Sequence, residues 1–295
     1  MPTPSGRWAL AERPFTVVDG RATGPGVFDM KAGLVTALDA LGLTGGADDV
    51  RMLVTGDEER GSPTSRALVE QAAAGCRAVL VLEPGQDGAL KTARKGVALY
   101  RLGVRGRAAH AGLEPEQGVN ALVELAHQVL AISGLGDTGR GTTVTPTVGR
   151  AGTTANTVPE SAHVEIDVRA WERRELARVE EALGVLCARL PGAGVHLAGG
   201  INRPPLERDM SAQLLLTAQR LAREHGLAAI GEARVGGASD GNFTAALGIP
   251  TLDGLGPAGA GAHARREWVD LGSLPERAML VAGLIGAPAG APVAP

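Results

Sequence analysis

The hydrophobic positions of the first ninety residues alternate between a helical and an extended pattern. Over residues 30–41 they recur at the helical period, after Asp29 as a candidate N-cap, which predicts a helix. Short apolar runs at 50–55 (VRMLVT) and 78–82 (AVLVL) predict two buried strands. Between them a serine and a proline open a second predicted helix, 62–75. This order of strand, helix and strand predicts that the two strands are parallel.

The pattern changes after residue 94. Extended and helical stretches follow in the order strand, helix, strand, strand, helix, strand, at 97–106, 117–132, 142–152, 162–170, 172–190 and 194–200. This order is typical of a self-contained two-layer sandwich. A helical pattern at 211–225 and an apolar run at 248–256 then resume the first type of organisation. We therefore expect an α/β protein in which residues 1–93 and 204–295 form one domain and a βαββαβ sandwich, 94–203, is inserted between them.

Composition removes several classes of protein. The formal net charge is −3 and 2% of the residues are aromatic, so neither a phosphate-neutralising surface nor base-stacking platforms are indicated and we expect no nucleic-acid partner. Cys76 and Cys187 form neither a CxxC motif nor a disulfide framework, which favours a reducing compartment, the cytoplasm by default. The apolar stretch 278–294 is interrupted by prolines, and residues 1–15 lack the pattern of a signal peptide. We expect no membrane partner.

Acidic residues follow both predicted strands of the first segment. Glu58 and Glu59 come after the first strand, Glu83 ends the second, and Asp29 precedes a helix. Because the carboxyl ends of parallel strands share one edge of a sheet, these side chains are expected to converge in one cleft. Clustered carboxylates repel one another and are costly to ionise without a counter-charge. A divalent cation would supply that charge.

His263 completes a metal-binding set. It lies in the glycine-rich loop GPAGAGAHARREWVD, beyond a predicted core strand, and carboxylates together with a histidine suit zinc. One of the adjacent Glu58 and Glu59 can ligate the ion while the other takes a proton from water that the cation has acidified. Taken singly, these glutamates are as well explained as solvated loop residues, Asp29 as an N-cap, and His263 as a surface histidine. The combined pattern favours a metal-assisted hydrolase.

Six sequence blocks in consecutive order carry a family resemblance. They read GPGVFDMKAG, TGDEERGSPTSR, LEPG, GRAAHAGLEPEQGVNAL, ANTVPESAHVEIDVR and GAHARREWVD. The chain resembles, over nearly its whole length, the co-catalytic zinc metallopeptidases, which include glutamate carboxypeptidase, acetylornithine deacetylase and succinyl-diaminopimelate desuccinylase. It is most similar to the glutamate carboxypeptidase branch. The resemblance implies a zinc-peptidase-like catalytic α/β domain with an inserted lid and dimerisation domain, and therefore a homodimer.

The same resemblance assigns roles to the acidic cluster. Asp29 would bridge two zinc ions, Glu59 and His263 would complete the site of one, and Glu83 would ligate the other. Glu58 would be the general base that passes the proton of water to the leaving amine.

Four residues of the inserted domain are implied to bind substrate. By the resemblance, His110 in the AAHAG block would reach the cleft of the partner subunit and polarise the scissile carbonyl or its oxyanion. Asn156, Arg169 and Arg203 would hold the substrate carboxylate, for which a guanidinium offers a planar fork.

The arginines also have ordinary explanations. Arg169 could equally form a salt bridge at the strand edge with Asp167 or Glu165, and Arg203 before two prolines could simply mark a hinge. His110 lies among alanines and glycine, which suits close approach of a substrate better than packing in a core.

The chain departs from the family pattern at its start. Family members carry a His-x-Asp motif upstream of the bridging aspartate, whose histidine ligates the second zinc, but no histidine precedes Asp29 here. Either Met1 is a wrongly assigned start of a longer protein, which we favour, or the chain is a truncated product with one defective metal position. In both cases the catalytic domain lacks its N-terminal part, and we expect this chain to be poorly soluble or poorly active, with the second ion held weakly.

We therefore predict a zinc-dependent hydrolase that cleaves the amide bond of a peptidyl or N-acyl amino acid, above all a carboxypeptidase that releases a C-terminal glutamate-like residue. Two alternatives stay open: a small-acyl amino-acid deacetylase or desuccinylase, and an inactive, truncated relic that still forms a dimer.

Overall fold

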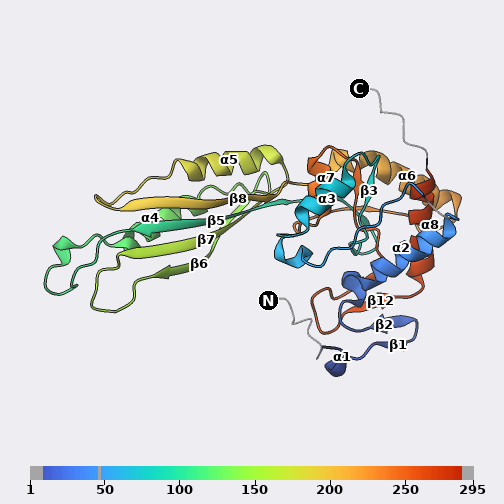
Figure 1. Ribbon diagram of the computed structural model, residues 1–295, viewed down its shortest axis with the longest axis horizontal. Coiled ribbons are helices and arrows are strands. Elements are labelled where there is room, and N and C mark those ends of the chain that lie inside the picture. The colour runs from blue at the N-terminus through green and yellow to red at the C-terminus, as the bar shows by residue number, and fades with distance from the viewer. Residues whose placement is uncertain (1–8, 46–47, 288–295) are drawn as a thin grey trace. The chain divides into compact units, whose positions relative to one another are not determined.

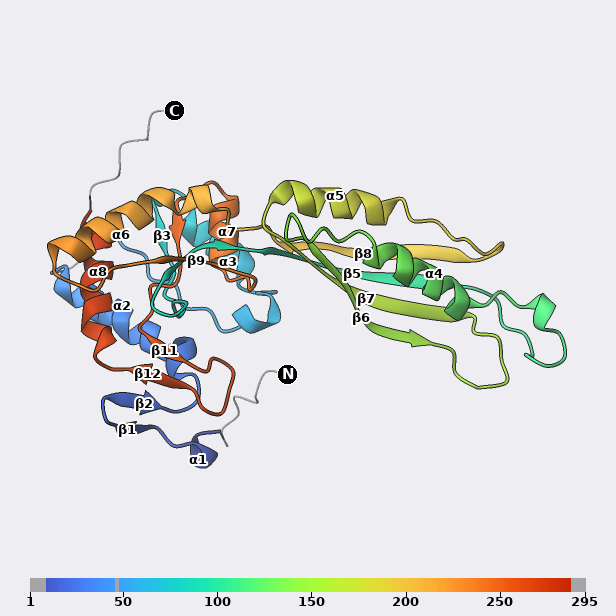
Figure 2. The same ribbon diagram turned by 180° about the vertical axis from the view of Figure 1, so that it is seen from behind.

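The computed structural model describes residues 9–45 and 48–287, which divide into two compact units (Figures 1 and 2). Unit 1 comprises the residues up to 94, 206–235 and those from 239 onward. Unit 2 comprises 95–205 together with 236–238. The sequence predicted one continuous insertion, whereas unit 2 also includes the separate short segment 236–238.

Unit 2 is a four-stranded antiparallel sheet with two helices. In chain order its elements are β5 (Gly96–Arg105), α4 (Ala121–Ser133), β6 (Thr143–Ala151), β7 (Ser161–Ala170), α5 (Arg173–Gly184) and β8 (Gly194–Arg203). The strands lie in the order β6-β7-β5-β8, and each neighbouring pair is antiparallel. Strands β6 and β8 are therefore the two edges of this sheet.

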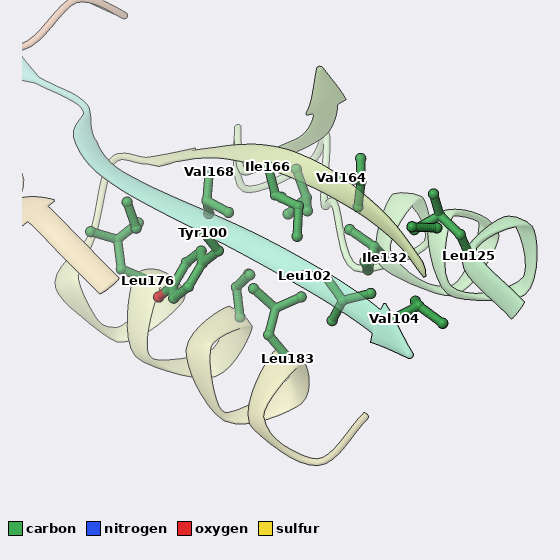
Figure 3. Close-up of a cluster of buried hydrophobic side chains, with 14 of the residues drawn as sticks. Tyr100, Leu102, Val104, Leu125, Ile132, Val164, Ile166, Val168, Leu176 and Leu183 are labelled. Carbon is green, nitrogen blue, oxygen red and sulfur yellow. The ribbon is translucent and has the colours of Figure 1, made fainter. Parts of the chain in front are cut away.

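The core of unit 2 follows from strict alternation along its central strands. In β7 every second side chain is buried, and so are Tyr100, Leu102 and Val104 of β5. Both helices contribute to the same hydrophobic cluster, so they cover one face of the sheet and leave the other face open. Figure 3 shows Tyr100 of β5 with Leu176 and Leu183 of α5 in the space between strand and helix.

The described part of unit 1 contains one antiparallel sheet and two short parallel strand pairs. The antiparallel sheet has the order β1 (Thr16–Val18), β2 (Arg21–Thr23), β12 (Trp268–Asp270) and β11 (Gly259–Ala260). The parallel pairs are β3 (Val79–Leu80) with β10 (Thr251–Leu252), and β4 (Leu90–Arg94) with β9 (Glu232–Val235). An antiparallel bridge between Lys91 and Asp253 connects the two parallel pairs.

The helices of unit 1 are α1 (Ala9–Glu12), α2 (Ala32–Leu43), α3 (Arg66–Ala73), α6 (Ala212–Glu224), α7 (Gly241–Ala246) and α8 (Ser273–Gly286). Leucines of α6 and α8 pack with Leu90, Leu252 and Leu255 in one hydrophobic cluster. Within the described ranges, no helix has the length and apolar character needed to cross a bilayer. The mixed α/β class predicted from the sequence is what the structure shows.

The predicted strand at 50–55 is wrong. These residues form neither a strand nor a helix, and Met52, Leu53 and Val54 are 44%, 39% and 59% exposed. An apolar run becomes a strand only where a neighbouring strand accepts and donates its backbone hydrogen bonds. None of the described strands pairs with this run. The expected parallel neighbour of 78–82 is instead β10.

The helices predicted over 62–75 and 172–190 are several residues shorter than their patterns. The helix expected over 62–75 begins only at Arg66, because the Ser62 hydroxyl donates to Asp240 rather than capping a helix. The helix expected over 172–190 ends at Gly184, and the N–H groups of Arg189 and Leu190 donate to the buried carboxylate of Glu124. In both places a distant carboxylate competes with the helix for hydrogen bonds.

Candidate metal centre

Helix α2 and the end of strand β3 approach each other closely at Gly33. A Cβ atom on Gly33 would lie 2.2 Å from the carbonyl oxygen of Leu82, so only glycine fits there. Gly33 follows Asp29 by about one helical turn, and Leu82 directly precedes Glu83. This contact therefore brings together the two segments that carry Asp29 and Glu83.

Asp29 lies in a turn, Val27–Lys31, that precedes α2. The helix begins at Ala32 with Lys31 at its N-cap position, so Asp29 is not the helix cap that its sequence position also suggested. Its own N–H donates to the carboxylate of Glu267 at 2.9 Å. Its side chain is 16% exposed and faces a histidine.

That histidine is His263, in the loop between β11 and β12. Its backbone has a φ of 60°, a left-handed conformation that histidine adopts more readily than most residues. The loop is tight: a Cβ on Gly261 would lie 2.9 Å from the carbonyl oxygen of Arg266. His263 Nε2 is 3.0 Å from Asp29 Oδ2 and 3.0 Å from Glu59 Oε1.

Glu58 and Glu59 lie in a short 3₁₀ turn, Glu58–Arg60. The residue before it, Asp57, holds the following loop: its carboxylate accepts from the N–H and hydroxyl of Thr64 at 2.8 and 2.7 Å, and from Ser65. These hydrogen bonds, first that of the Ser65 hydroxyl, lower the pKa of Asp57 below its ordinary value. Asp57 thus remains an ionised anchor for the turn that presents both glutamates.

The geometry of Asp29, Glu59 and His263 suits a divalent ion. Each offers one ligand atom, and these atoms all lie within 4.8 Å of one another. Zinc with tetrahedral bonds of about 2.0–2.1 Å would hold its ligand atoms about 3.3 Å apart, close to the two observed separations of 3.0 Å. Carboxylate oxygens and imidazole nitrogens are both ligand atoms that zinc binds in proteins. Among the residues that the structure describes, this is the one such group.

Glu83 is close to this group but outside it. Its side chain is 14% exposed, and burial raises its pKa to about 8, with Asp253 and Asp29 adding to the rise and Arg94 opposing it. Arg94 Nη2 is 3.8 Å from Glu83 Oε2. The same guanidinium makes two hydrogen bonds, of 2.7 and 3.0 Å, to the fully buried Asp253. Arg94 is therefore shared between Glu83 and Asp253, and Lys91 also interacts with both carboxylates.

The predicted substrate residues His110 and Asn156 lie together at one end of unit 2. His110 is exposed, and its Nδ1 accepts from the N–H groups of Gly112 and Leu113 at 3.1 and 3.2 Å. A neutral ring therefore carries its proton on Nε2. The carbonyl oxygen of Asn156 accepts from the N–H of Ala111 at 2.9 Å, and the Asn156 side chain is exposed.

Arg169 and Arg203 flank Val97 on the open face of the sheet. Val97 is opposite Arg169 on β7 and opposite Arg203 on β8, so the three side chains share one face. The Arg169 guanidinium bonds Asp167 at 2.9 and 3.1 Å, which is the salt bridge that the sequence left open, and it also donates to the Gly236 carbonyl at 3.1 Å. Arg203 is buried, with 7% of its surface exposed.

The sequence missed four residues around the centre: Asp57, Arg94, Asp253 and Glu267. For the last three, the partner lies far along the chain, 159 residues for the pair of Arg94 with Asp253 and 238 for Glu267 with Asp29. No local periodicity marks such contacts. Only the position of Asp57 beside two candidate glutamates offered a hint.

Comparison with known proteins connects this site to a family. The model of the peptidase family M20/M25/M40 matches residues 1–287. The chain is 33% identical to carboxypeptidase G2 of Pseudomonas sp. (strain RS-16) over 287 residues, 94% of this chain and 69% of that protein. It is 31% identical to succinyl-diaminopimelate desuccinylase 2 of Shewanella loihica over 202 residues, 60% of this chain and 53% of that protein. The solved structure of aminopeptidase PepT from Bacillus cereus ATCC 10987 shares the fold, with a TM-score of 0.75 and 24% identity over 92% of this chain and 75% of that one.

Proposed function

Because this chain belongs to the peptidase family M20/M25/M40, as its motifs predicted, we propose that it is a zinc-dependent hydrolase of the amide bonds of peptidyl or N-acyl amino acids. The observation that carries the proposal is the convergence of Asp29, Glu59 and His263 within 4.8 Å. These ligands come from a turn, a 3₁₀ turn and a strand-connecting loop that are separate in the sequence. A cation explains why their side chains point toward one another.

Zinc held by Asp29, Glu59 and His263 would supply Lewis acidity, which makes water able to lose a proton near neutral pH. Glu58 is the proposed general base. It shares the 3₁₀ turn of the ligand Glu59, so its carboxylate can take the proton of the attacking water and pass it to the leaving nitrogen. Of the two adjacent glutamates, Glu59 is the proposed metal ligand and Glu58 is the residue proposed to act on the solvent molecule.

Glu83 is the proposed ligand of a second zinc ion, which it would share with Asp29. The repulsion among Glu83, Asp29 and Asp253 contributes to the raised pKa of Glu83. A second cation would relieve that repulsion and keep Glu83 ionised. This chain's described residues would then hold the second ion through fewer ligands than the first.

We propose that unit 2 binds substrate. With Nδ1 occupied by two backbone donors, the Nε2–H of His110 is available to donate to a carbonyl oxygen or an oxyanion. The part-exposed guanidinium of Arg169 would bind a substrate carboxylate in competition with Asp167, and the buried Arg203 would support it from the neighbouring strand. The exposed amide of Asn156 can add a hydrogen bond. A substrate with a free carboxylate, such as a peptide with a C-terminal glutamate, suits this set.

The most specific form of the proposal is a carboxypeptidase that releases a glutamate-like residue, supported by 33% identity to carboxypeptidase G2. A small-acyl deacetylase or desuccinylase is the second candidate, favoured by the similarity to a succinyl-diaminopimelate desuccinylase. An inactive dimer-forming protein is the third. Rates on N-acyl glutamates, dipeptides and acetylated basic amino acids separate the first two, and zinc content near zero with an intact dimer supports the third.

Unit 2 also offers a surface for a homodimer. Strand β6 is an edge strand with mostly exposed residues, and its backbone can pair with a second copy. Helix α4 exposes Leu122, Val123 and Leu130, the last with 75% of its surface accessible. Exposed leucine and valine beside an open strand edge suit a second copy of this chain.

The proposal is tested by Glu58→Gln and by metal removal. Zinc per chain is measured by elemental analysis, and hydrolysis is followed on the substrate panel. We expect Glu58→Gln to lower kcat by about 10²–10⁴-fold while zinc content is unchanged, since only the base is removed. Glu224→Gln on the exposed surface of α6 is the matched control and keeps full activity.

Two outcomes contradict parts of this proposal. Undiminished turnover in Glu58→Gln would remove Glu58 from the reaction. Turnover that persists after exhaustive chelation would remove the metal.

A further inference from the structure

Glu267 is a buried carboxylate that binds the backbone of the Asp29 turn. It is 5% exposed. Its Oε2 accepts from the N–H of Gly26 at 2.7 Å, and its Oε1 accepts from the N–H groups of Phe28 and Asp29 at 3.0 and 2.9 Å. Both carboxylate oxygens are therefore engaged by backbone donors, and Glu267 is not a member of the ligand group.

Glu267 also belongs to the loop that carries the histidine ligand. It follows His263 by four residues and directly precedes β12. Strand β12 pairs with β2, and Arg21 of β2 lies over the Trp268 ring at 4.1 Å, so the residue after Glu267 is held by the sheet. One side chain thus connects the His263 loop to the Asp29 turn across 238 positions of sequence.

We propose that Glu267 is the positioning residue of the metal centre. By fixing the backbone at Asp29 relative to the loop of His263, it holds these two ligands 3.0 Å apart before an ion binds. The inference rests on the proposed function, since it assumes that zinc is bound by Asp29, Glu59 and His263. It adds a residue that acts through the ligands and touches neither metal nor substrate.

The physical reason is the cost of ordering flexible ligands. If Glu267 is lost, three N–H groups of the turn lose their acceptor, and Asp29 can adopt backbone conformations that do not bind the ion. Binding must then pay for ordering the turn, which weakens affinity. A glutamine at this position is a close steric match, but it replaces one acceptor oxygen with an NH₂ donor that faces backbone donors. Mutation of a residue that holds a metal ligand in place typically lowers metal affinity by about 10–100-fold.

The experiment compares Glu267→Gln with the wild type and with Asp270→Asn. Asp270 is a matched control because its carboxylate accepts one backbone N–H, that of Gly272 at 3.0 Å, and it lies on the same strand as the residue after Glu267. The zinc dissociation constant is measured by competition with a chromophoric chelator. Amide hydrogen exchange of the zinc-free protein is measured at Gly26, Phe28 and Asp29, and thermal unfolding reports folding.

We expect Glu267→Gln to raise the zinc dissociation constant about 10–100-fold, to speed exchange at the three amides, and to regain kcat at saturating zinc. Asp270→Asn should leave all three measurements unchanged. If Glu267→Gln does not yield folded protein, the zinc dissociation constant is measured for Glu267→Asp, which keeps the charge but has a shorter side chain. The same increase in the constant is expected.

The outcomes separate this inference from the proposed function. Absence of zinc binding to the wild type overturns the proposed function and the inference with it. Tight binding to the wild type with an unchanged dissociation constant in Glu267→Gln overturns the inference alone. An equal loss of affinity in Asp270→Asn also overturns it, because the effect would then reflect general stability.

Discussion

The contact between Gly33 and Leu82 makes a prediction that can be worked out from the structure. In Gly33→Ala the new Cβ would lie 2.2 Å from the Leu82 carbonyl oxygen, whereas ordinary contacts of this kind are 3.4–4 Å. The obstructing atom belongs to the backbone, so no rotamer change removes the clash. Helix α2 and the end of strand β3 must therefore separate by more than about 1 Å, which a close-packed interior resists.

The sign of the effect depends on two opposing terms. Replacing glycine by alanine within a helix raises the free energy of unfolding by up to about 1 kcal/mol, because alanine loses less backbone entropy on folding. Overpacking of this kind costs about 1–3 kcal/mol, and more where the backbone cannot move. Because the obstructing atom is backbone, the cost lies at the upper end of that range, and after the gain in helix propensity is subtracted we expect Gly33→Ala to lower the free energy of unfolding by about 2 kcal/mol.

Gly42 supplies the matched control in the same helix. A Cβ at Gly42 would have no atom within 4 Å, so Gly42→Ala gains helix propensity without a clash. It should raise the free energy of unfolding by up to about 1 kcal/mol. The same substitution at two sites of α2 is thus expected to have opposite effects.

Urea unfolding followed by far-UV circular dichroism measures both variants. Gly33→Ala should also bind zinc more weakly, because the displaced strand end carries Glu83 and the displaced helix carries Asp29. If Gly33→Ala is as stable as Gly42→Ala, the close approach of α2 to Leu82 does not exist in solution.

Three further predictions concern charge and association. Hydrogen bonds from Arg178, with others from Arg140 and a threonine, lower the pKa of Glu175 to about 2, so its stabilisation is present above about pH 4.5 and is lost as pH falls toward 2. Glu175→Gln should therefore be less stable at pH 7, and its free energy of unfolding should fall less steeply as the pH is lowered. An unchanged pH dependence would argue against the hydrogen bonds of Glu175 with Arg178 and Arg140. Asp57→Asn weakens the anchor of the catalytic turn and should lower kcat about 10–100-fold in steady-state assays, and wild-type rates would exclude that role. Leu130→Glu should shift sedimentation from dimer to monomer, whereas an unaltered dimer would place the interface elsewhere.

The local pattern of hydrophobic residues predicted those helices and strands whose apolar side chains recur at a regular spacing. The strands and helices of unit 2 lie close to where alternation and helical spacing had indicated, because one face of each is buried in a shared core. The run at 50–55 shows the limit of this reasoning. Its apolar character predicted a strand, yet among the described residues it has no neighbouring strand, and its side chains are exposed.

The residues of the candidate metal centre likewise fall into those that the sequence predicted and those that it did not. Acids after strand ends and a histidine in a glycine-rich loop are visible in the sequence, because catalytic chemistry restricts residue type and loop position. The hydrogen bonds that Asp57 makes lie within eight residues, so only their pattern was missed. The Arg94 pair with Asp253 was invisible because neither residue shows a local signal for the other.

The family, the α/β class and the set of side chains able to ligate or to move a proton could be read from residue type and periodicity. Folding was needed to bring Asp29, Glu59 and His263 together and to place Glu83 beside Arg94. It also places Glu267 against the turn of Asp29. Such contacts are made by backbone groups and by side chains far apart in the chain, and their energies depend on distances that exist only after folding.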